Sequence, residues 1–503
     1  MRSLKPGELV LATVALAIGA FMNVLDSTIV NVSLSHIAGD FGVAPNNGTW
    51  VITSYAVSEA IFLPLIGWLT TRFGVLRQYI WATLLFTLAS MFCGISPTFE
   101  ILLISRVLQG VVGASMIPLS QSIMMMLYPK DKKAVALGIW AMTVVIAPIV
   151  GPILGGWITD TFSWRWSFYI NLPFGIISTF IIHKLAKSLN MKDDIKKEPI
   201  DIWGLVFLTI GIASLQLMLD KGNDLNWFES PTIIILAITS FIFLVILGIW
   251  EWHQEKPVVN VRLFLNRNFT IGAISLTIGQ SIFFASVVVI PLWLQNYMGY
   301  TAYLSGLATA SLGIPILLLA PIIGRIIPKV DVRKLIVIGF LLFAIVAIFF
   351  SAFPPNVTMK YIAANRFYTG FGLALFFTPL NFLTLSHIPE NELPSASGLY
   401  NFMRNMGSSF GTSLSVNYWT HKTAFFHSSL IGAINYGNPN FTDFLQKIPG
   451  TMSSKLAAID YLITNQAATM SLNQLSYVSG LCILALIPFI FLAKNKLTKK
   501  DEN

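Results

Sequence analysis

The sequence predicts an all-α, polytopic membrane protein. Of its 503 residues, 55% are hydrophobic and only 11% are charged, and the mean hydropathy is +0.71. No soluble domain of this size needs so much apolar sequence, whereas a chain that crosses a bilayer many times does. The positive residues behind the net charge of +9 lie mainly in short loops between apolar runs. Such a pattern indicates membrane orientation rather than nucleic-acid binding.

Fourteen apolar runs have the length of a membrane span, with edges uncertain by about four residues. They fall at about 9–34, 49–69, 78–96, 99–127, 134–156, 167–187, 201–220, 231–252, 269–291, 303–325, 333–353, 360–385, 396–420 and 474–494. The first run follows Arg2 and Lys5 as a signal peptide would, but it contains Asn23 and Asp26, so we expect it to be retained. An even number of spans and the excess of Lys and Arg on the terminal side predict two cytoplasmic termini.

The chain also repeats itself at an offset of 260 residues. The related pairs are Arg106 and Arg366, Gly110 and Gly370, Pro129 and Pro389, Ala136 and Ala396, Gly138 and Gly398, and Gly151 and Gly411. Coincidence is the alternative, since apolar sequence aligns easily with itself. The repeat predicts two six-span halves, at 1–190 and 261–503, with a linker and two inserted spans at 191–260. A binding site is then expected near the midplane between the halves.

Two acidic residues lie far from the ends of the apolar runs of the first half. Asp26 is deep in the first run, and an ionised carboxylate at that depth costs about 3 kcal/mol, so it must face a partner or water. Arg106 enters the fourth run at a similar depth from the outer side, where the two meet or share a cavity. Glu59, near the middle of the second run, is a second candidate to bind a proton. A buried ion pair that only fixes packing, and a permanently protonated Glu59, are the structural alternatives.

Two further arginines enter apolar runs of the second half. Arg366 repeats Arg106, and we interpret it as structural. Arg404 enters the thirteenth run and has either a structural or a binding role.

The stretch 147–156 places two prolines and three glycines inside a spanning run. Prolines in a membrane helix produce a kink rather than an end, because neighbouring groups satisfy the freed backbone. Ala147, Gly151 and Gly155 lie on one face and let another helix approach closely. We expect Gly151 and Gly155 to contact a span of the other half, with Pro148 and Pro152 setting the kink; a kinked packing helix is the alternative.

Polar and aromatic residues in the spans are candidates to line a cavity for a flat or lipophilic compound. The proposed lining residues are Asn31, Gln109, Trp140, Phe283, Phe284, Phe377, Asn401 and Arg404.

These motifs resemble those of the major facilitator superfamily, in its fourteen-span EmrB/QacA-type branch. Residues 147–156 and the following Trp164-Arg165-Trp166 resemble its proline/glycine antiporter motif, which includes Gly156, and the segment after it. Residues 25–32 and 105–110 resemble its span 1 and span 4 signatures. The resemblance implies the major facilitator fold and a proton-coupled exporter of drug-like compounds, with Asp26, Glu59 and Arg106 in proton coupling.

The loop after the second run resembles the gating motif of the superfamily in Gly67, Arg72 and Gly74. It departs from that motif at Thr71, where aspartate is usual, and at Val75 and Leu76, where basic residues are usual. The charge lock between the halves that the family motif implies is therefore in doubt.

The resemblance further implies lipophilic or cationic substrates, the inner (cytoplasmic) membrane and, for EmrB-like members, a periplasmic adaptor with an outer-membrane channel. An exporter of a specific metabolite, such as a siderophore or lipid precursor, is the main alternative. An intramembrane enzyme is disfavoured, because the six histidines stand at span ends or in loops and no cluster suits a metal or nucleophile. No cofactor and no nucleic acid are expected.

Residues 421–473 form the longest external segment. Phe441, Phe444, Leu445 and Ile448 follow a helical spacing, so we expect a helical hairpin that dips towards the outer cavity.

Overall fold

The computed structural model describes residues 6–129, 132–189, 201–255, 257–349, 352–354, 357–432, 434, 439–447 and 449–494. Every regular element in these ranges is a helix, so the predicted all-α class is confirmed. Twelve of the described helices are long and apolar enough to cross a membrane, and one pair bent by 64° makes a thirteenth candidate. The predicted run 396–420 lies in a helix that is too rich in polar residues to be counted among these apolar helices.

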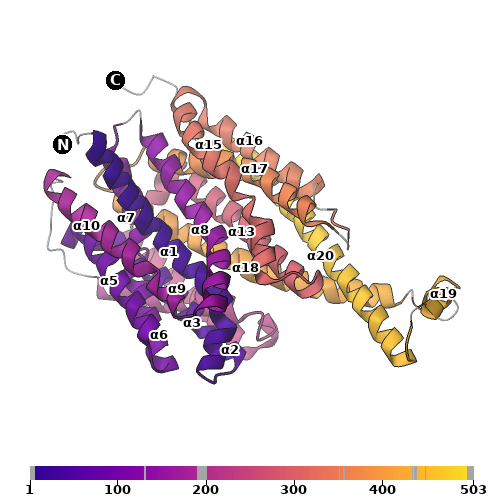
Figure 1. The fold of residues 1–503 in the computed structure, drawn as a ribbon. Coiled ribbons are helices and arrows are strands. Elements are labelled where there is room, and N and C mark those ends of the chain that lie inside the picture. The colour runs from indigo at the N-terminus through magenta and orange to yellow at the C-terminus, as the bar shows by residue number, and fades with distance from the viewer. Residues whose placement is uncertain are drawn as a thin grey trace.

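The N-terminal helices pack around α1, in the indigo and purple part of Figure 1. They are α1 (Pro6–Asp40), α2 (Pro45–Gly48), α3 (Trp50–Phe62), α4 (Ile66–Phe73), α5 (Val75–Ile95), α6 (Phe99–Gly113), α7 (Met116–Leu127), α8 (Lys133–Thr161), α9 (Trp166–Tyr169) and α10 (Asn171–Leu189). Helix α1 lies against α7, α8 and α10, and α3 lies against α6. The bent pair is α3 and α4.

The C-terminal helices pack around α13 and α17. They are α13 (Arg267–Tyr297), α14 (Ala302–Ala310), α15 (Gly313–Ile326), η3 (Ile327–Lys329), α16 (Val332–Phe349), α17 (Met359–Leu385), α18 (Leu393–Ile431), α19 (Pro439–Lys447) and α20 (Met452–Phe491). Between the two groups come α11 (Ile202–Lys221), η1 (Trp227–Glu229), α12 (Pro231–His253) and η2 (Val261–Leu265). Helix α11 packs on α12 and also on α3 and α18, one from each group.

Residues related by the 260-residue offset meet where the two groups touch. Gln121 on α7 donates from Nε2 to Oδ1 of Asn381 on α17 at 2.9 Å, and the two positions are 260 residues apart. A Cβ on Gly138 would lie 2.6 Å from the carbonyl oxygen of Ala320, across the same interface. Its counterpart Gly398 approaches the carbonyl oxygen of Leu63 in the same way, at 2.8 Å. The repeat is therefore expressed as matching close helix contacts, while the domain limits at 190 and 260 remain a prediction.

The expectation that Gly151 and Gly155 contact the other half is wrong. A Cβ on Gly151 would meet Thr28 of α1, and one on Gly155 would lie 2.7 Å from the carbonyl oxygen of Ile29. Both glycines thus face α1, within the N-terminal group. Because the helix turns by about 100° per residue, a different face of α8 points across the interface. On that face, Ile153 lies against Gly306 of α14.

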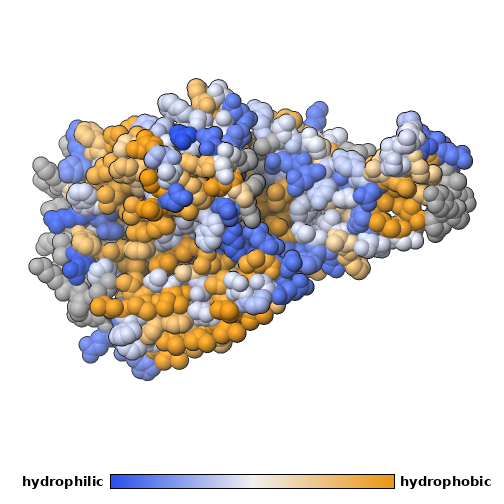
Figure 2. All heavy atoms as spheres, turned by 90° about the horizontal axis from the view of Figure 1, so that it is seen from below, coloured by the Kyte–Doolittle hydropathy of each residue, from blue (hydrophilic) through white to orange (hydrophobic). Residues whose placement is uncertain are grey.

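The external segment is helical where it is described, but it does not dip towards the cavity. Helices α18 and α20 extend beyond the other helices as an arm, and α19 lies at its far end (Figure 1). Figure 2 shows a largely hydrophobic main body, whereas the arm is mostly pale or blue with an apolar patch near its end. Leu445 of α19 is buried and Phe444 is exposed; Ile448 lies outside the described residues. A helix end this polar is better solvated than buried in an apolar site.

Two adjacent glycines of α8 allow a matched test of the α1–α8 contact. Gly155→Ala places a methyl group 2.7 Å from a backbone oxygen and is expected to lower the Tm of the purified protein. At Gly156 the nearest atom is a Val32 methyl group at 3.8 Å, so Gly156→Ala is expected to leave the Tm unchanged or raise it, because Ala favours the helix by about 1 kcal/mol. Equal effects of the two substitutions would contradict the contact.

Candidate functional site

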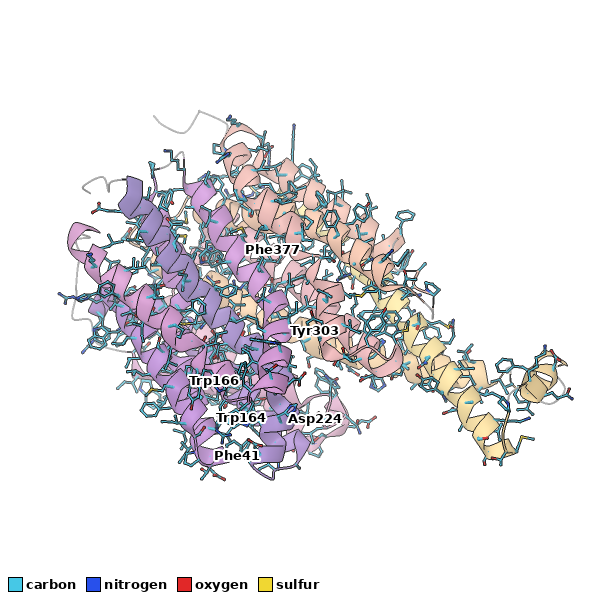
Figure 3. All side chains as sticks on the ribbon, in the orientation of Figure 1. Phe41, Trp164, Trp166, Asp224, Tyr303 and Phe377 are labelled. Carbon is cyan, nitrogen blue, oxygen red and sulfur yellow. The ribbon has the colours of Figure 1, made fainter. Side chains whose placement is uncertain are left out.

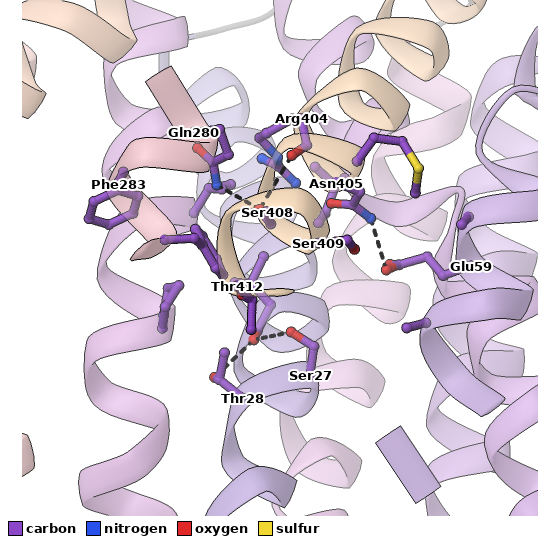
Figure 4. A pocket seen from close by; sticks show the side chains of 18 of the residues that line it. Ser27, Thr28, Glu59, Gln280, Phe283, Arg404, Asn405, Ser408, Ser409 and Thr412 are labelled. Carbon is purple, nitrogen blue, oxygen red and sulfur yellow. Dashed lines mark hydrogen bonds between the residues drawn. The ribbon is translucent and has the colours of Figure 1, made fainter. Parts of the chain in front are cut away.

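A cavity of about 480 Å³ lies between the N-terminal and C-terminal groups of helices. Its walls come from α1, α3 and α8 on one side and from α13, α17 and α18 on the other, and α11 completes them. Most of the lining is apolar, with a small number of convergent polar groups, which is the usual composition of a small-molecule site. Figure 4 shows these polar groups along α18, facing α1, α3 and α13.

Glu59 and Arg404 bring opposite charges to this cavity. Both side chains are more than nine-tenths buried, and both line the cavity. Glu59 accepts a hydrogen bond at Oε2 from Nδ2 of Asn405 at 3.1 Å (Figure 4). Its Oε1 accepts another from the Tyr55 hydroxyl at 3.3 Å. Arg404 lies 5.9 Å from the centre of the Trp140 ring, and its buried Nη1 has no hydrogen-bond partner among the described residues. One donor of a charged group is thus available to a ligand.

Asp26 and Arg106 form a separate network that is closed off from the cavity, although Nη2 of Arg106, like Nη1 of Arg404, makes no hydrogen bond to a described residue. Nη1 of Arg106 donates to Oδ2 of Asp26 at 2.6 Å, and both side chains are fully buried. The other oxygen, Oδ1, accepts from Nε2 of Gln109 at 2.9 Å and from Nδ2 of Asn171 at 2.7 Å. Nε of Arg106 donates to the Val51 carbonyl at 3.0 Å. The predicted meeting of Asp26 and Arg106 is found, but neither residue lines the cavity.

Tyr55 stands between the network and the cavity. Its ring lies 4.3 Å from the guanidinium carbon of Arg106, and its hydroxyl donates to Glu59. Asn23 donates to that hydroxyl at 3.0 Å and also to the Gly113 carbonyl, which fixes the ring between α1 and α6. A change in the charge of Glu59 is therefore transmitted to the Asp26–Arg106 pair through the side chain of Tyr55.

The cavity contains most of the residues predicted to line it. Asn31, Trp140, Phe283, Phe284, Phe377 and Arg404 all contribute to its surface, and so do Glu59 and Pro148. The ring centre of Phe283 lies 5.6 Å from that of Phe284 and 5.8 Å from that of Phe377.

Two of the predicted lining residues lie elsewhere. Gln109 is fully buried and holds Asp26. Asn401 is fully buried and donates to Oε1 of Gln121 at 2.8 Å, at the interface between the groups. Each amide satisfies a buried polar partner instead of facing the cavity, because an unpaired buried group is costly.

Sequence reasoning missed a polar stripe on α18 and the contribution of α11. Ser408 and Thr412 follow Arg404 at intervals of four residues, and Asn405 and Ser409 form a parallel row (Figure 4). This spacing on one face of a helix is the signal that identifies them. From α11, Gln216 and Asp220 also reach the cavity, with Gln216 donating to Asp220 at 3.0 Å.

Helix α4 approaches the other group of helices, and Gly74 separates it from α5. A Cβ on Gly67 would lie 2.7 Å from Cβ of Ser395 on α18, and Gly74 has a φ of 85°, which favours glycine. Arg72 is exposed and lies 5.5 Å from the Trp68 ring. Gly67 and Gly74 thus have backbone roles, and the gating function of Gly67, Arg72 and Gly74 remains a prediction.

The Trp164-Arg165-Trp166 segment joins the ends of α1 and α8. Trp164 donates from Nε1 to Oδ2 of Asp40 at 2.7 Å, and Arg165 donates to the same oxygen at 3.1 Å. Trp164 also packs on Phe41, as Figure 3 shows, far from Phe377. Its role is structural at this end of the N-terminal group. Among the described residues, no group of three or more His, Cys, Asp or Glu side chains is arranged to hold a metal ion.

Comparison with known proteins gives consistent results over nearly the whole chain. Residues 16–412 match the family described as Major Facilitator Superfamily. The chain is 42% identical over 492 residues to the "Multidrug export protein EmrB" of Haemophilus influenzae (97% of this chain and 96% of the relative). It is 39% identical over 498 residues to the protein of the same name from Escherichia coli K12 (98% and 97%). The human organic anion transporter MFSD10 has a similar fold, with a TM-score of 0.58 at 11% identity, covering 95% of this chain and 100% of that one.

The closed network predicts a specific stability pattern. Asp26→Asn leaves the Arg106 charge buried and unpaired, which is expected to cost about 3–5 kcal/mol and lower the Tm. Removing both charges, in Asp26→Asn with Arg106→Gln, is expected to restore much of this loss. Thermal unfolding of the single and double variants in detergent measures the coupling. A single variant as stable as the parent would contradict a structural role for the pair.

Proposed function

The chain belongs to the major facilitator superfamily, and we propose that it exports small lipophilic or cationic compounds from the cell in exchange for protons. The observation that carries the proposal is Glu59, a titratable carboxylate on the wall of the cavity between the two groups of helices. The printed names of the two EmrB relatives support multidrug export. The fold and the relatives are those of transporters rather than enzymes.

Exchange follows if the proton and a cationic substrate compete for Glu59. A carboxylate in a mostly apolar cavity needs a positive partner, because a lone buried charge is costly. Arg404 supplies part of that charge across the cavity, and a proton or a cationic substrate supplies the rest. Binding of one ligand then expels the other. The aromatic cluster of Phe283, Phe284 and Phe377 gives a lipophilic compound an apolar surface.

Asp26 and Arg106 take a different part in this proposal. Their network holds α1 to α6 and fixes Tyr55, which in turn orients Glu59. Protonation of Asp26 would break the pair and release these contacts, so Asp26 is the second proton site proposed. Its effect on the substrate is indirect, because it does not line the cavity.

Alternating access requires the two groups to separate on the side opposite the arm. There, Ser122 donates to the Leu393 carbonyl at 3.2 Å, and Lys133 pairs with Glu390 at 3.4 Å. The Gln121–Asn381 and Asn401–Gln121 hydrogen bonds close the same interface. Water can replace these polar contacts when the site opens, whereas the close helix contacts at Gly138 and Gly398 have to separate.

The chain is a multi-pass membrane protein. We place it in the inner (cytoplasmic) membrane with both termini cytoplasmic, which puts the α18–α20 arm outside. A periplasmic adaptor and an outer-membrane channel are the protein partners proposed.

The exchange predicts that substrate binding releases protons. Adding a lipophilic cation such as ethidium to the purified protein in weakly buffered detergent is expected to acidify the solution. Glu59→Gln is expected to reduce the released protons by at least about tenfold, because the competing site has lost its charge. Glu100→Gln, at the start of α6 and away from the cavity, is the matched control and should match the parent.

Export is then measured in proteoliposomes with an imposed pH gradient. Parental transport by Glu59→Gln would contradict the assignment of Glu59. Binding without proton release in the parent would contradict proton exchange itself.

A further inference from the structure

The C-terminal group contains a buried arginine whose charge is not matched by a carboxylate. Arg366 on α17 is 7% exposed, and its Nε and Nη2 donate to Oδ1 of Asn365 at 3.0 and 2.7 Å. Its Nη1 donates to Oγ of Ser286 at 3.1 Å. Both acceptors are neutral. Among the described residues no charged group acts on this guanidinium, in contrast to Arg106 with Asp26 and Arg404 with Glu59.

The internal repeat shows where the missing carboxylate would stand. The residue 260 positions after Arg106 is Arg366, and the residue 260 positions after Asp26 is Ser286. The two pairs make the same contact, since Nη1 donates to Asp26 in one group and to Ser286 in the other. The C-terminal group therefore retains the geometry of the ion pair but has a hydroxyl group in place of the carboxylate.

A small cavity adjoins this arginine. It has a volume of about 30 Å³ and is formed by α13, α16, α17 and α20. Arg366, Ser286 and Thr369 contribute to its surface, as do Ser476 and Ser479 of α20. The hydroxyl groups of Ser476 and Ser479 make no hydrogen bond to any other described residue, so they are available as donors. This volume exceeds what one water molecule requires, and the rest of the lining is largely apolar.

From this arrangement we infer that the cavity beside Arg366 binds a small monovalent anion, with chloride as the abundant candidate. A guanidinium out of water is strongly stabilised by a negative partner, and removing that partner is costly. The anion takes the electrostatic place that Asp26 has beside Arg106, and the serine hydroxyls donate to it. The size of the cavity favours a halide over sulfate or an organic anion. This site is separate from the substrate cavity, with which it shares no lining residue.

Chloride-dependent stability of the purified full-length protein tests the inference. The Tm is measured while sodium gluconate is replaced by sodium chloride at constant ionic strength. The parent is expected to show a saturable rise in Tm that bromide reproduces and gluconate does not, because a ligand that binds the folded state stabilises it. Arg366→Gln is expected to weaken the apparent chloride affinity by at least about tenfold, since the charged donor is lost.

Ser286→Asp is the decisive variant. It provides a fixed carboxylate 260 residues after Asp26, and is expected to abolish the chloride dependence while keeping the Tm at or above that of the chloride-free parent. Arg165→Gln changes the net charge equally at a partly exposed arginine and should leave the chloride response unchanged. Binding of radioactive chloride to each variant gives a readout that does not depend on unfolding.

Either of two results would overturn the inference: no halide-specific rise in the parent, which indicates a water-filled cavity, or an undiminished chloride response in well-folded Ser286→Asp. Neither result bears on proton exchange at Glu59, because these measurements involve neither transport nor substrate.

Discussion

The cost of an unmatched charge inside a bilayer is the constraint on which this structure depends. Three of the described arginines are buried among the helices, and their surroundings differ. Arg106 is paired with Asp26 at 2.6 Å and enclosed by amides. Arg404 faces Glu59 across a cavity that a ligand can enter. Arg366 has neutral acceptors alone among the described residues. The closed pair, Arg106 with Asp26, is suited to hold helices together. The open pair, Arg404 with Glu59, lines the cavity and is suited to exchange its partners.

The same constraint gives α1 a central role. It provides Asp26 to the closed network, Thr28 and Ile29 to the contact with α8, and Asn31 to the cavity. One helix therefore connects the ion pair, the proline-containing helix and the site. Because Tyr55 touches both Arg106 and Glu59, the closed and the open pair are neighbours rather than independent features.

Periodicity and residue type predicted the spans and the Asp26–Arg106 pair, because hydropathy and the rarity of charges in membranes are strong signals. The helix that packs on the small-residue face of α8 was harder to predict. The small residues at 147, 151 and 155 predict a close contact, but the sequence does not say with which helix, and the structure places α1 there. Gln109 and Asn401 illustrate a similar limit. An amide in a span is polar in either role, and only the neighbours decide whether it binds a ligand or a buried carboxylate.

Difference infrared spectroscopy of the carboxyl groups on substrate binding tests whether Glu59 is the carboxylate that exchanges its proton. We expect that a protonated-carboxyl band is lost when a cationic substrate binds, that Glu59→Gln lacks this band change, and that well-folded Asp26→Asn retains it. Loss of the band change in Asp26→Asn, with retention in Glu59→Gln, would show that the proton is exchanged at the closed pair. That result would contradict the assignment of the exchanged proton to Glu59.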